Sequence, residues 1–117
     1  RNVTAEARDA GLVTLTAKVD ELSRFLLNAK VNDRLAASAP FLTMVSVMVC
    51  GWLMERQGRI ADAQLAGTSP DNPFLRAKSA SCRWYLRHIV PEALGLAASV
   101  AAGASDLYDI ATEELAI

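Results

Sequence analysis

The residues best suited to acid–base or nucleophilic chemistry are a single histidine, His88, and two cysteines, Cys50 and Cys82. His88 can exchange a proton near neutral pH. Glu92 lies one helical turn further on, but Pro91 interrupts that turn. Cys-His catalysis needs an exposed thiol and an orienting group, whereas Cys50 lies in the most apolar stretch of the chain. We therefore expect His88 to be structural, and both cysteines to be reduced, buried, small apolar residues, as in a cytoplasmic protein.

The carboxylates show no pattern of a metal site or an acid–base pair. Asp20-Glu21 and Glu113-Glu114 are sequence neighbours, so the two side chains of each pair diverge around a helix. Di-iron helical bundles need Glu-x-x-His motifs on two helices, and the sequence contains none. The glycines are scattered and do not form a phosphate-binding loop. We predict no catalytic, cofactor-binding or metal-binding residue in this chain.

Three arginines, Arg76, Arg83 and Arg87, follow one another at steps of seven and four residues. On a helix they share one face, and Arg56 and Arg59 add positive charge to the preceding segment. Such a face is typical of a contact with ligand phosphates or an acidic partner surface. The simpler interpretation is a solvated face whose ion pairs contribute little.

The aromatic residues Trp52, Trp84 and Tyr85 allow two interpretations. They can anchor an interface, or they can lie in the core with each polar group finding a partner. The core is the commoner place for aromatic residues on long helices. The candidate interface residues are Trp52, Trp84, Tyr85, Arg76, Arg83 and Arg87.

The overall composition indicates one globular domain. The chain has 117 residues, of which 52% are apolar and 21% charged, so it can bury a core and disorder is not expected. Its net charge is −1. A nucleic-acid partner would require a strongly basic surface, so we expect none.

The first segment predicts a long amphipathic helix. From about Thr4 to Lys30, apolar residues recur at alternating steps of three and four, which corresponds to a helix of about 40 Å. Gly11 weakens its first turns, and Asn32-Asp33 marks a break or a new start. The predicted apolar stripe comprises Leu12, Leu15, Val19, Leu22, Leu26 and Ala29.

A second helical segment runs from about Asp33 to Ala66, and Pro40 should break or kink it. Residues 41–54 are apolar nearly all round, so we expect this helix to be central in the bundle. That run is shorter than the about 20 residues that span a bilayer. Beyond it, Ile60 and Ala63 are expected to point inward.

The clearest loop comprises residues 67–73. Gly67 can close the helix before it, while Asn72 can cap the next helix with Pro73 at its first position. We expect a third helix over about residues 74–90.

Small residues dominate the end of the chain. Pro91 should kink or end the third helix, and a helix is expected over residues 92–102. Gly103 ends it, and Ser105 is expected to cap a last short helix. The sequence therefore predicts an all-α fold, an up-down antiparallel bundle of about four main helices kinked at Pro40 and Pro91.

Several short motifs occur in a definite order along the chain. They are Pro40-Phe41-Leu42, Gly51-Trp52, Phe74-Leu75-Arg76-Ala77-Lys78, Arg83-Trp84-Tyr85, His88-Ile89-Val90-Pro91-Glu92 and Ala102-Gly103-Ala104. This order resembles the extra C-terminal helical domain of a subgroup of bacterial acyl-CoA dehydrogenases, closest to the branch of methylmercaptopropionyl-CoA type. The likeness covers residues 12–115. Cys50 departs from it, as does the polar junction Asn32-Asp33-Arg34.

The resemblance implies an FAD-containing parent enzyme that oxidises an acyl-CoA at its α and β carbons. In that family the flavin and the glutamate base belong to preceding domains, so no catalytic residue is carried over and no cofactor is expected in this fragment. Because the chain begins at Arg1, we expect the C-terminal fragment of a larger, cytoplasmic flavoenzyme. Its expected role is structural, with the preceding core domains as partner in a homo-oligomer.

Two other functions are compatible with the sequence. A membrane-surface helix would pair an apolar face with a basic one, and residues 41–54 lack the basic face, so a membrane partner is not expected. A stand-alone helical module for dimerisation or for binding an apolar ligand stays open as the alternative.

Overall fold

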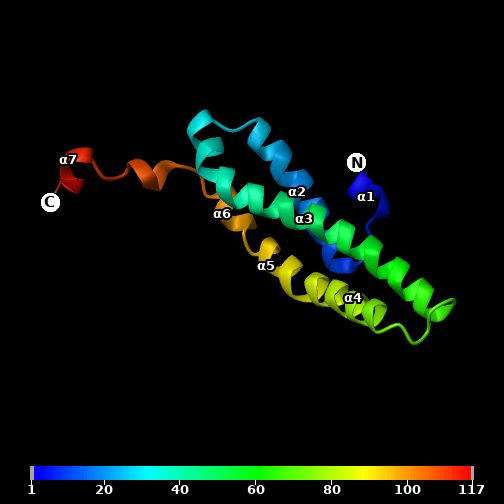
Figure 1. Ribbon diagram of the computed structural model, residues 1–117. Helices are drawn as coiled ribbons and strands as arrows, with labels where there is room; N and C mark the ends of the chain where they lie inside the picture. The colour runs from blue at the N-terminus through cyan, green and yellow to red at the C-terminus, as the bar shows by residue number, and fades with distance from the viewer. Residues whose placement is uncertain (1, 117) are drawn as a thin grey trace.

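The computed structural model describes residues 2–116, and each regular element in this range is helical (Figure 1). The prediction of an all-α bundle is confirmed. Its principal extents are 67 × 33 × 15 Å, so it is long and thin. The elements are α1 (Asn2–Glu6), α2 (Ala10–Leu27), α3 (Val31–Ala66), α4 (Pro73–Trp84), the π-helix η1 (Tyr85–Ile89), α5 (Val90–Leu94), α6 (Ala97–Ala101), the 3-10 helix η2 (Ser105–Tyr108) and α7 (Thr112–Leu115).

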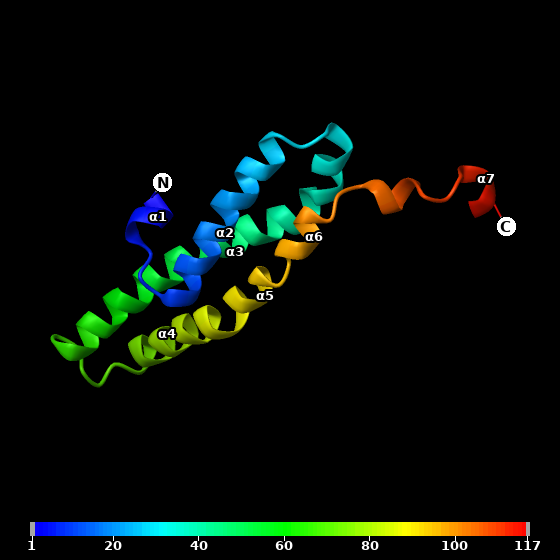
Figure 2. The same ribbon diagram turned by 180° about the vertical axis from the view of Figure 1, so that it is seen from behind.

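The long helix α3 is the element on which the others assemble. It contacts α1 and α2 as well as α4, η1, α5 and α6. Figure 2 shows α2 running along one side of α3, while the chain from α4 to α6 returns along the other side. The core cluster joins α2, α3, α5 and α6 through Leu15, Val19, Leu22, Ala37, Met44, Val90, Ala93 and Val100.

The first predicted helix is divided in two, so the expectation of one helix from Thr4 to Lys30 is wrong. The break lies at Asp9, whose backbone is extended and whose side chain accepts the Leu12 N–H, as an N-cap does. The predicted apolar stripe is confirmed for the residues buried in α2, which are Leu12, Leu15, Val19 and Leu22.

Helix α3 runs without interruption through Pro40. A proline inside a helix removes one hydrogen bond and bends the axis. The first turns of α3, cyan in Figure 1, are inclined to the rest. Pro40 therefore kinks the helix and does not break it.

The face of α3 that packs on the bundle carries small residues at steps of seven: Ala37, Gly51 and Gly58, with Met44 among them. A Cβ atom on Gly58 would lie 3.0 Å from the Cys82 Cβ on α4. The close approach of α3 and α4 thus depends on this glycine. The expectation that Ile60 and Ala63 point inward is wrong, since both are exposed.

The predicted loop after α3 is confirmed. Gly67 follows the last helical residue, and the Asn72 side chain accepts the N–H groups of Phe74 and Leu75 with Pro73 at the first helical position. These are the capping roles that the residue types predict.

The third predicted helix contains a π-helical turn at η1, just before Pro91. The Val90 N–H donates to the Tyr85 carbonyl, five residues back. A π-turn is a recognised cause of helix bending. The bend that was predicted at Pro91 is thus shared between the proline and this turn.

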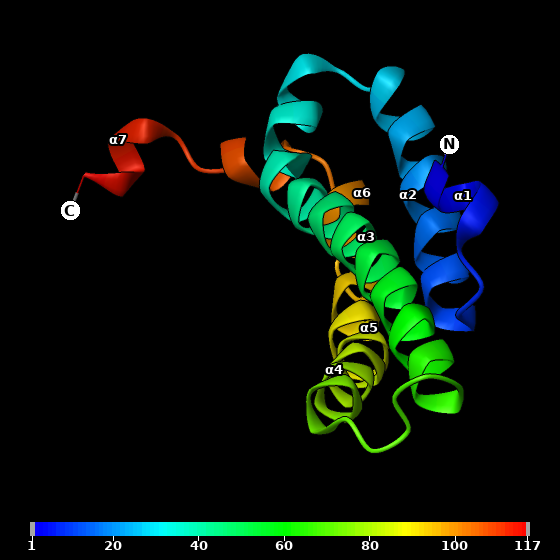
Figure 3. The same cartoon turned by 45° about the vertical axis from the view of Figure 1, so that its right-hand side comes forward.

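Helix α6 ends at Ala101, and the C-terminal part begins at Gly103, whose φ is +80°. Asp33 at the start of α3 accepts the N–H of Ala104 at 2.9 Å. Beyond that bond, η2 and α7 project from the bundle (Figures 1 and 3). Ser105 is the first residue of η2, and the position before it is Ala104, so the predicted Ser105 cap is wrong. The helix predicted over residues 92–102 is likewise interrupted, between α5 and α6.

Candidate functional site

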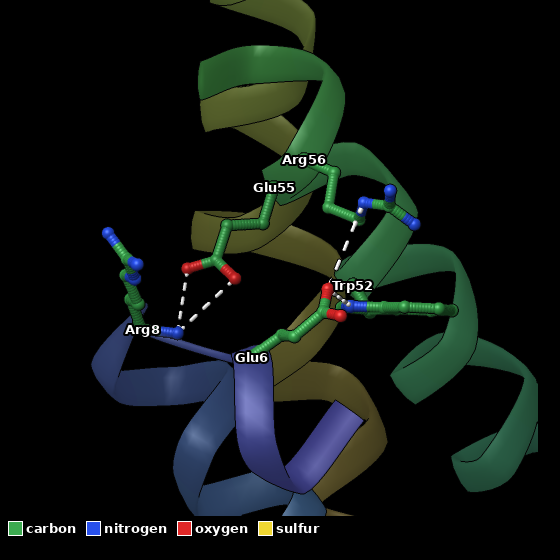
Figure 4. A network of polar contacts seen from close by, with 5 residues as sticks. All are labelled: Glu6, Arg8, Trp52, Glu55 and Arg56. Carbon is green, nitrogen blue, oxygen red and sulfur yellow. Dashed lines mark hydrogen bonds and ion pairs between the residues drawn. The ribbon is translucent and has the colours of Figure 1, made fainter. Parts of the chain in front are cut away.

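A buried carboxylate, Glu55, joins the N-terminal elements to α3 (Figure 4). Its side chain accepts the backbone N–H of Arg8 at 2.9 and 3.2 Å and that of Asp9 at 2.5 Å. These N–H groups lie between α1 and α2, where no helical carbonyl is available to them. Glu55 is 7% exposed, and hydrogen bonds from N–H groups compensate a buried carboxylate. Its role is to fix the α1–α2 junction.

Beside it, Trp52 connects α3 with α1 (Figure 4). The indole Nε1 donates to Glu6 at 3.0 Å. The Arg56 guanidinium lies 5.2 Å from the centre of the Trp52 ring, and its Nε lies 3.9 Å from the Glu6 carboxylate. The half-buried Trp52 therefore already has partners within this chain.

A cleft of about 290 Å³ lies between the α1–α2 junction, α3 and α4. Arg8, Arg59 and Arg83 each line it, one from each of these elements. In its wall the buried Ser79 hydroxyl donates to Asp62 on α3 and accepts a hydrogen bond from the Arg83 guanidinium. The structure thus brings the predicted Arg83 together with Arg59, and adds Arg8.

The other predicted interface residues lie elsewhere. Arg76 and Arg87 are exposed and do not line this cleft. Trp84 is 56% exposed and stacks on His88 with a centroid separation of 5.4 Å. Tyr85 is half-buried and packs against the core. The interpretation as core residues therefore holds better for Tyr85 than for Trp84.

The two cysteines differ. Cys82 is buried as predicted, whereas Cys50 is exposed, so the prediction for Cys50 is wrong. Burial raises the pKa of the Cys82 thiol, an effect that Lys78 and Arg83 partly offset. Burial also raises the pKa of Tyr85, and the neighbouring Cys50 thiol adds to that increase.

The acidic pairs have ordinary structural roles. Asp20 and Glu21 form ion pairs with Arg24 and Lys18 on the same helix, and Glu114 accepts the N–H of Ala111. Within residues 2–116, no three His, Cys, Asp or Glu side chains are grouped as metal ligands.

The side of α3 turned away from the bundle exposes large apolar side chains, so the prediction that residues 41–54 are central is wrong for this side. The residues lie at steps of seven, seven, four and seven, and we call them the outer face. It consists of Leu35, Leu42, Val49, Leu53 and Ile60, exposed by 65%, 66%, 38%, 41% and 57%. Residues at this spacing form one continuous stripe on a helix.

By length and composition alone, α3 is long and apolar enough to cross a membrane: its most apolar 18-residue window has a mean hydropathy of 1.6. We expected the apolar run of residues 41–54 to be too short to span a bilayer. The complete helix α3, with 36 residues, is long enough. Mostly buried core helices of soluble proteins pass the same test, whereas only 17% of this window is buried within the chain. Because α3 also holds Glu55 in a set of hydrogen bonds to α1–α2, we interpret it as a packing helix with one uncovered face.

Comparison with known proteins gives one match. A family model described as "Acetyl-CoA dehydrogenase C-terminal like" matches residues 2–111. No curated protein and no solved structure match the chain.

Proposed function

Because the chain belongs to the family of acetyl-CoA dehydrogenase C-terminal-like domains, we propose that it is the non-catalytic docking domain of an FAD-dependent acyl-CoA dehydrogenase. The parent enzyme would oxidise acyl-CoA to enoyl-CoA, with the flavin and the catalytic base on preceding domains of the same protein. It would be a cytoplasmic homo-oligomer.

The observation that carries this proposal is the outer face of α3. Monomeric proteins rarely leave a continuous apolar surface uncovered unless it binds something. The stripe runs along α3 from Leu35 to Ile60, about 38 Å at a rise of 1.5 Å per residue. In a C-terminal domain, the preceding domains are held close to α3 by the covalent chain, and we assign the outer face to them.

We place the flavin and the catalytic base on the preceding domains and not among the described residues. A hollow of about 460 Å³ between the start of α3 and η2 has the charged side chains of Lys30 and Asp33 in its wall. The buried glutamate, Glu55, has both oxygens engaged by backbone N–H groups, so it is not free to abstract a proton.

The activity is tested on the full-length protein that carries this domain. We expect a visible flavin spectrum that bleaches when acyl-CoA is added without oxygen. A colourless protein, or a flavin that acyl-CoA does not reduce, would contradict an acyl-CoA dehydrogenase parent.

The docking role is tested by the double substitution Leu42→Ser and Leu53→Ser in the same full-length protein. We expect the flavin spectrum to persist while the domain becomes loosely attached, so that a protease releases it at least tenfold faster. A matched control is Ala80→Ser and Ser81→Thr, which changes exposed residues of α4 away from the outer face. Equal release rates for both variants would contradict docking through the outer face.

A second copy of the chain is the alternative occupant of the outer face. In that case the 117-residue chain alone would be a dimer by light scattering, and Leu42→Ser would make it monomeric. Docking on the preceding domains predicts a light-scattering mass of a monomer at low micromolar concentration.

A further inference from the structure

The arginines of the α3–α4 cleft are not neutralised by ion pairs of their own. The cations paired within residues 2–116 are Lys18, Arg24 and Arg56. Arg8, Arg59 and Arg83, which line the cleft, are not among them. Three guanidinium groups from three different elements therefore border one hollow.

The carboxylates in the same cleft already have hydrogen-bond donors. Glu55 accepts backbone N–H groups at the α1–α2 junction. The Asp9 side chain accepts the backbone N–H of Leu12 at the start of α2, and the Asp62 carboxylate accepts a hydrogen bond from the Ser79 hydroxyl. Each of these acids keeps its negative charge, but within residues 2–116 none of them forms an ion pair with Arg8, Arg59 or Arg83.

Arg59 supplies the most specific observation. Its Nε is shielded from solvent and has no hydrogen-bond partner in the described part of the chain. A buried donor without an acceptor costs about 1–3 kcal/mol and is uncommon in folded proteins, so it calls for an explanation. Because Arg59 lines the cleft, an acceptor bound there is a candidate partner for its guanidinium group.

We propose that the cleft binds a phosphate-type oxyanion. Guanidinium groups bind such anions through paired N–H donors, and a tetrahedral oxyanion can accept from several directions at once. Arg83 is held at the cleft by the buried Ser79 hydroxyl, which Asp62 orients in turn. The volume of about 290 Å³ is slightly below the range of about 300–1,000 Å³ for sites that enclose drug-sized ligands. The cleft thus fits an inorganic phosphate or the phosphate end of a larger molecule.

The proposal is tested on the 117-residue chain by NMR of the arginine Nε–Hε groups, with circular dichroism to check helicity. Inorganic phosphate, pyrophosphate and adenosine 3′,5′-diphosphate are titrated in turn, with sodium chloride at equal ionic strength as reference. We expect the Arg59 signal to move saturably, and the effect to weaken as salt increases. Tenfold tighter binding of the nucleotide would identify the phosphate end of a larger molecule, whereas equal affinities would identify free phosphate.

Arg59→Gln and Arg83→Gln should each weaken binding at least about tenfold, as expected when a charged hydrogen bond is lost. Arg76→Gln, on the same helix as Arg83 but outside the cleft, is the matched control and should leave binding unchanged. If Arg59→Gln lowers the helicity, Arg8→Gln at the exposed rim replaces it. Shifts that are linear and similar at all arginines would overturn the proposal. It would also be overturned if acetate moved the Arg59 signal as strongly as phosphate, which would assign the cleft to a partner's carboxylate.

Discussion

The two faces of α3 both carry apolar residues at helical spacing, yet only one is buried. The inner face carries Ala37, Gly51 and Gly58 around Met44. The outer face carries leucine, valine and isoleucine, all more than a third exposed. What separates the faces is side-chain size, since small residues let α2 and α4 approach closely. Hydropathy alone therefore does not identify the inward side of this helix.

The difference between the two faces also distinguishes two effects that a substitution in α3 can have. Substitutions on the inner face should act on the stability of the chain itself. Substitutions on the outer face should act on what the chain contacts. Single substitutions on each face distinguish the two effects.

The strongest test compares Met44→Ala with Leu42→Ala. Met44 is fully buried and Leu42 is 66% exposed. Truncating a buried methionine costs about 2–5 kcal/mol, whereas a change at an exposed position usually stays within about 0.5 kcal/mol. Urea unfolding of the 117-residue chain measures both. Similar losses for the two variants would contradict the assignment of the faces.

Glu55→Gln should destabilise the chain by about 1–3 kcal/mol, because a buried N–H loses a charged acceptor. NMR signals of the Arg8 and Asp9 amide protons should shift strongly. The control is Glu21→Gln, at an exposed ion pair with Lys18, which should change the free energy of unfolding by less than about 1 kcal/mol. An unchanged Arg8 amide would refute the capping role of Glu55.

Gly58→Ala should lower stability by about 1 kcal/mol, since overpacking at the Cys82 Cβ outweighs the better helix propensity of alanine. Gly51→Ala should be less harmful. Its added Cβ would meet the end of the flexible Leu12 side chain at 3.0 Å, which can move aside. The midpoints of thermal unfolding of the two variants test this order. If Gly51→Ala were less stable than Gly58→Ala, α3 and α4 would not be in the close contact described.

The smallest effect is a loss of stability at alkaline pH. Burial raises the pKa of Cys82 in the folded chain, so the unfolded chain loses this proton first. The protonated thiol makes its full contribution to the free energy of unfolding below the ordinary thiol pKa of about 8.5. This contribution decreases as the pH rises towards the raised pKa. Cys82→Ala should make this decline shallower, and the Cys50→Ala control, at the exposed thiol, should alter it less. An identical decline in wild type and Cys82→Ala would contradict the prediction.

Local sequence signals predicted part of the fold. The loop was predictable because Gly67, Asn72 and Pro73 act within one turn of the residues they cap. The buried stripe of α2 was predictable from its spacing. The regular recurrence of Ala37, Gly51 and Gly58 was also visible, and it would have identified the inner face of α3 if residue size had been weighed with hydropathy.

Other features depend on contacts between distant residues. The break before α2 requires Glu55, which lies 46 residues beyond Asp9. The candidate cleft gathers Arg8, Arg59 and Arg83 from three elements, and only Arg83 belonged to the predicted interface residues. Cys50 was predicted to be buried because its neighbours are apolar, but those neighbours include exposed residues of the outer face.

The central claim is that the outer face of α3 is covered in the full-length enzyme. The most direct test introduces a thiol by Ser46→Cys, at an exposed site between Leu42 and Val49, in a Cys50→Ala background. Its alkylation rate is compared between the 117-residue chain and the full-length protein, with Ser81→Cys on α4 as control. We predict at least tenfold protection of the α3 thiol in the full-length protein. Equal alkylation rates in the two proteins would contradict the account.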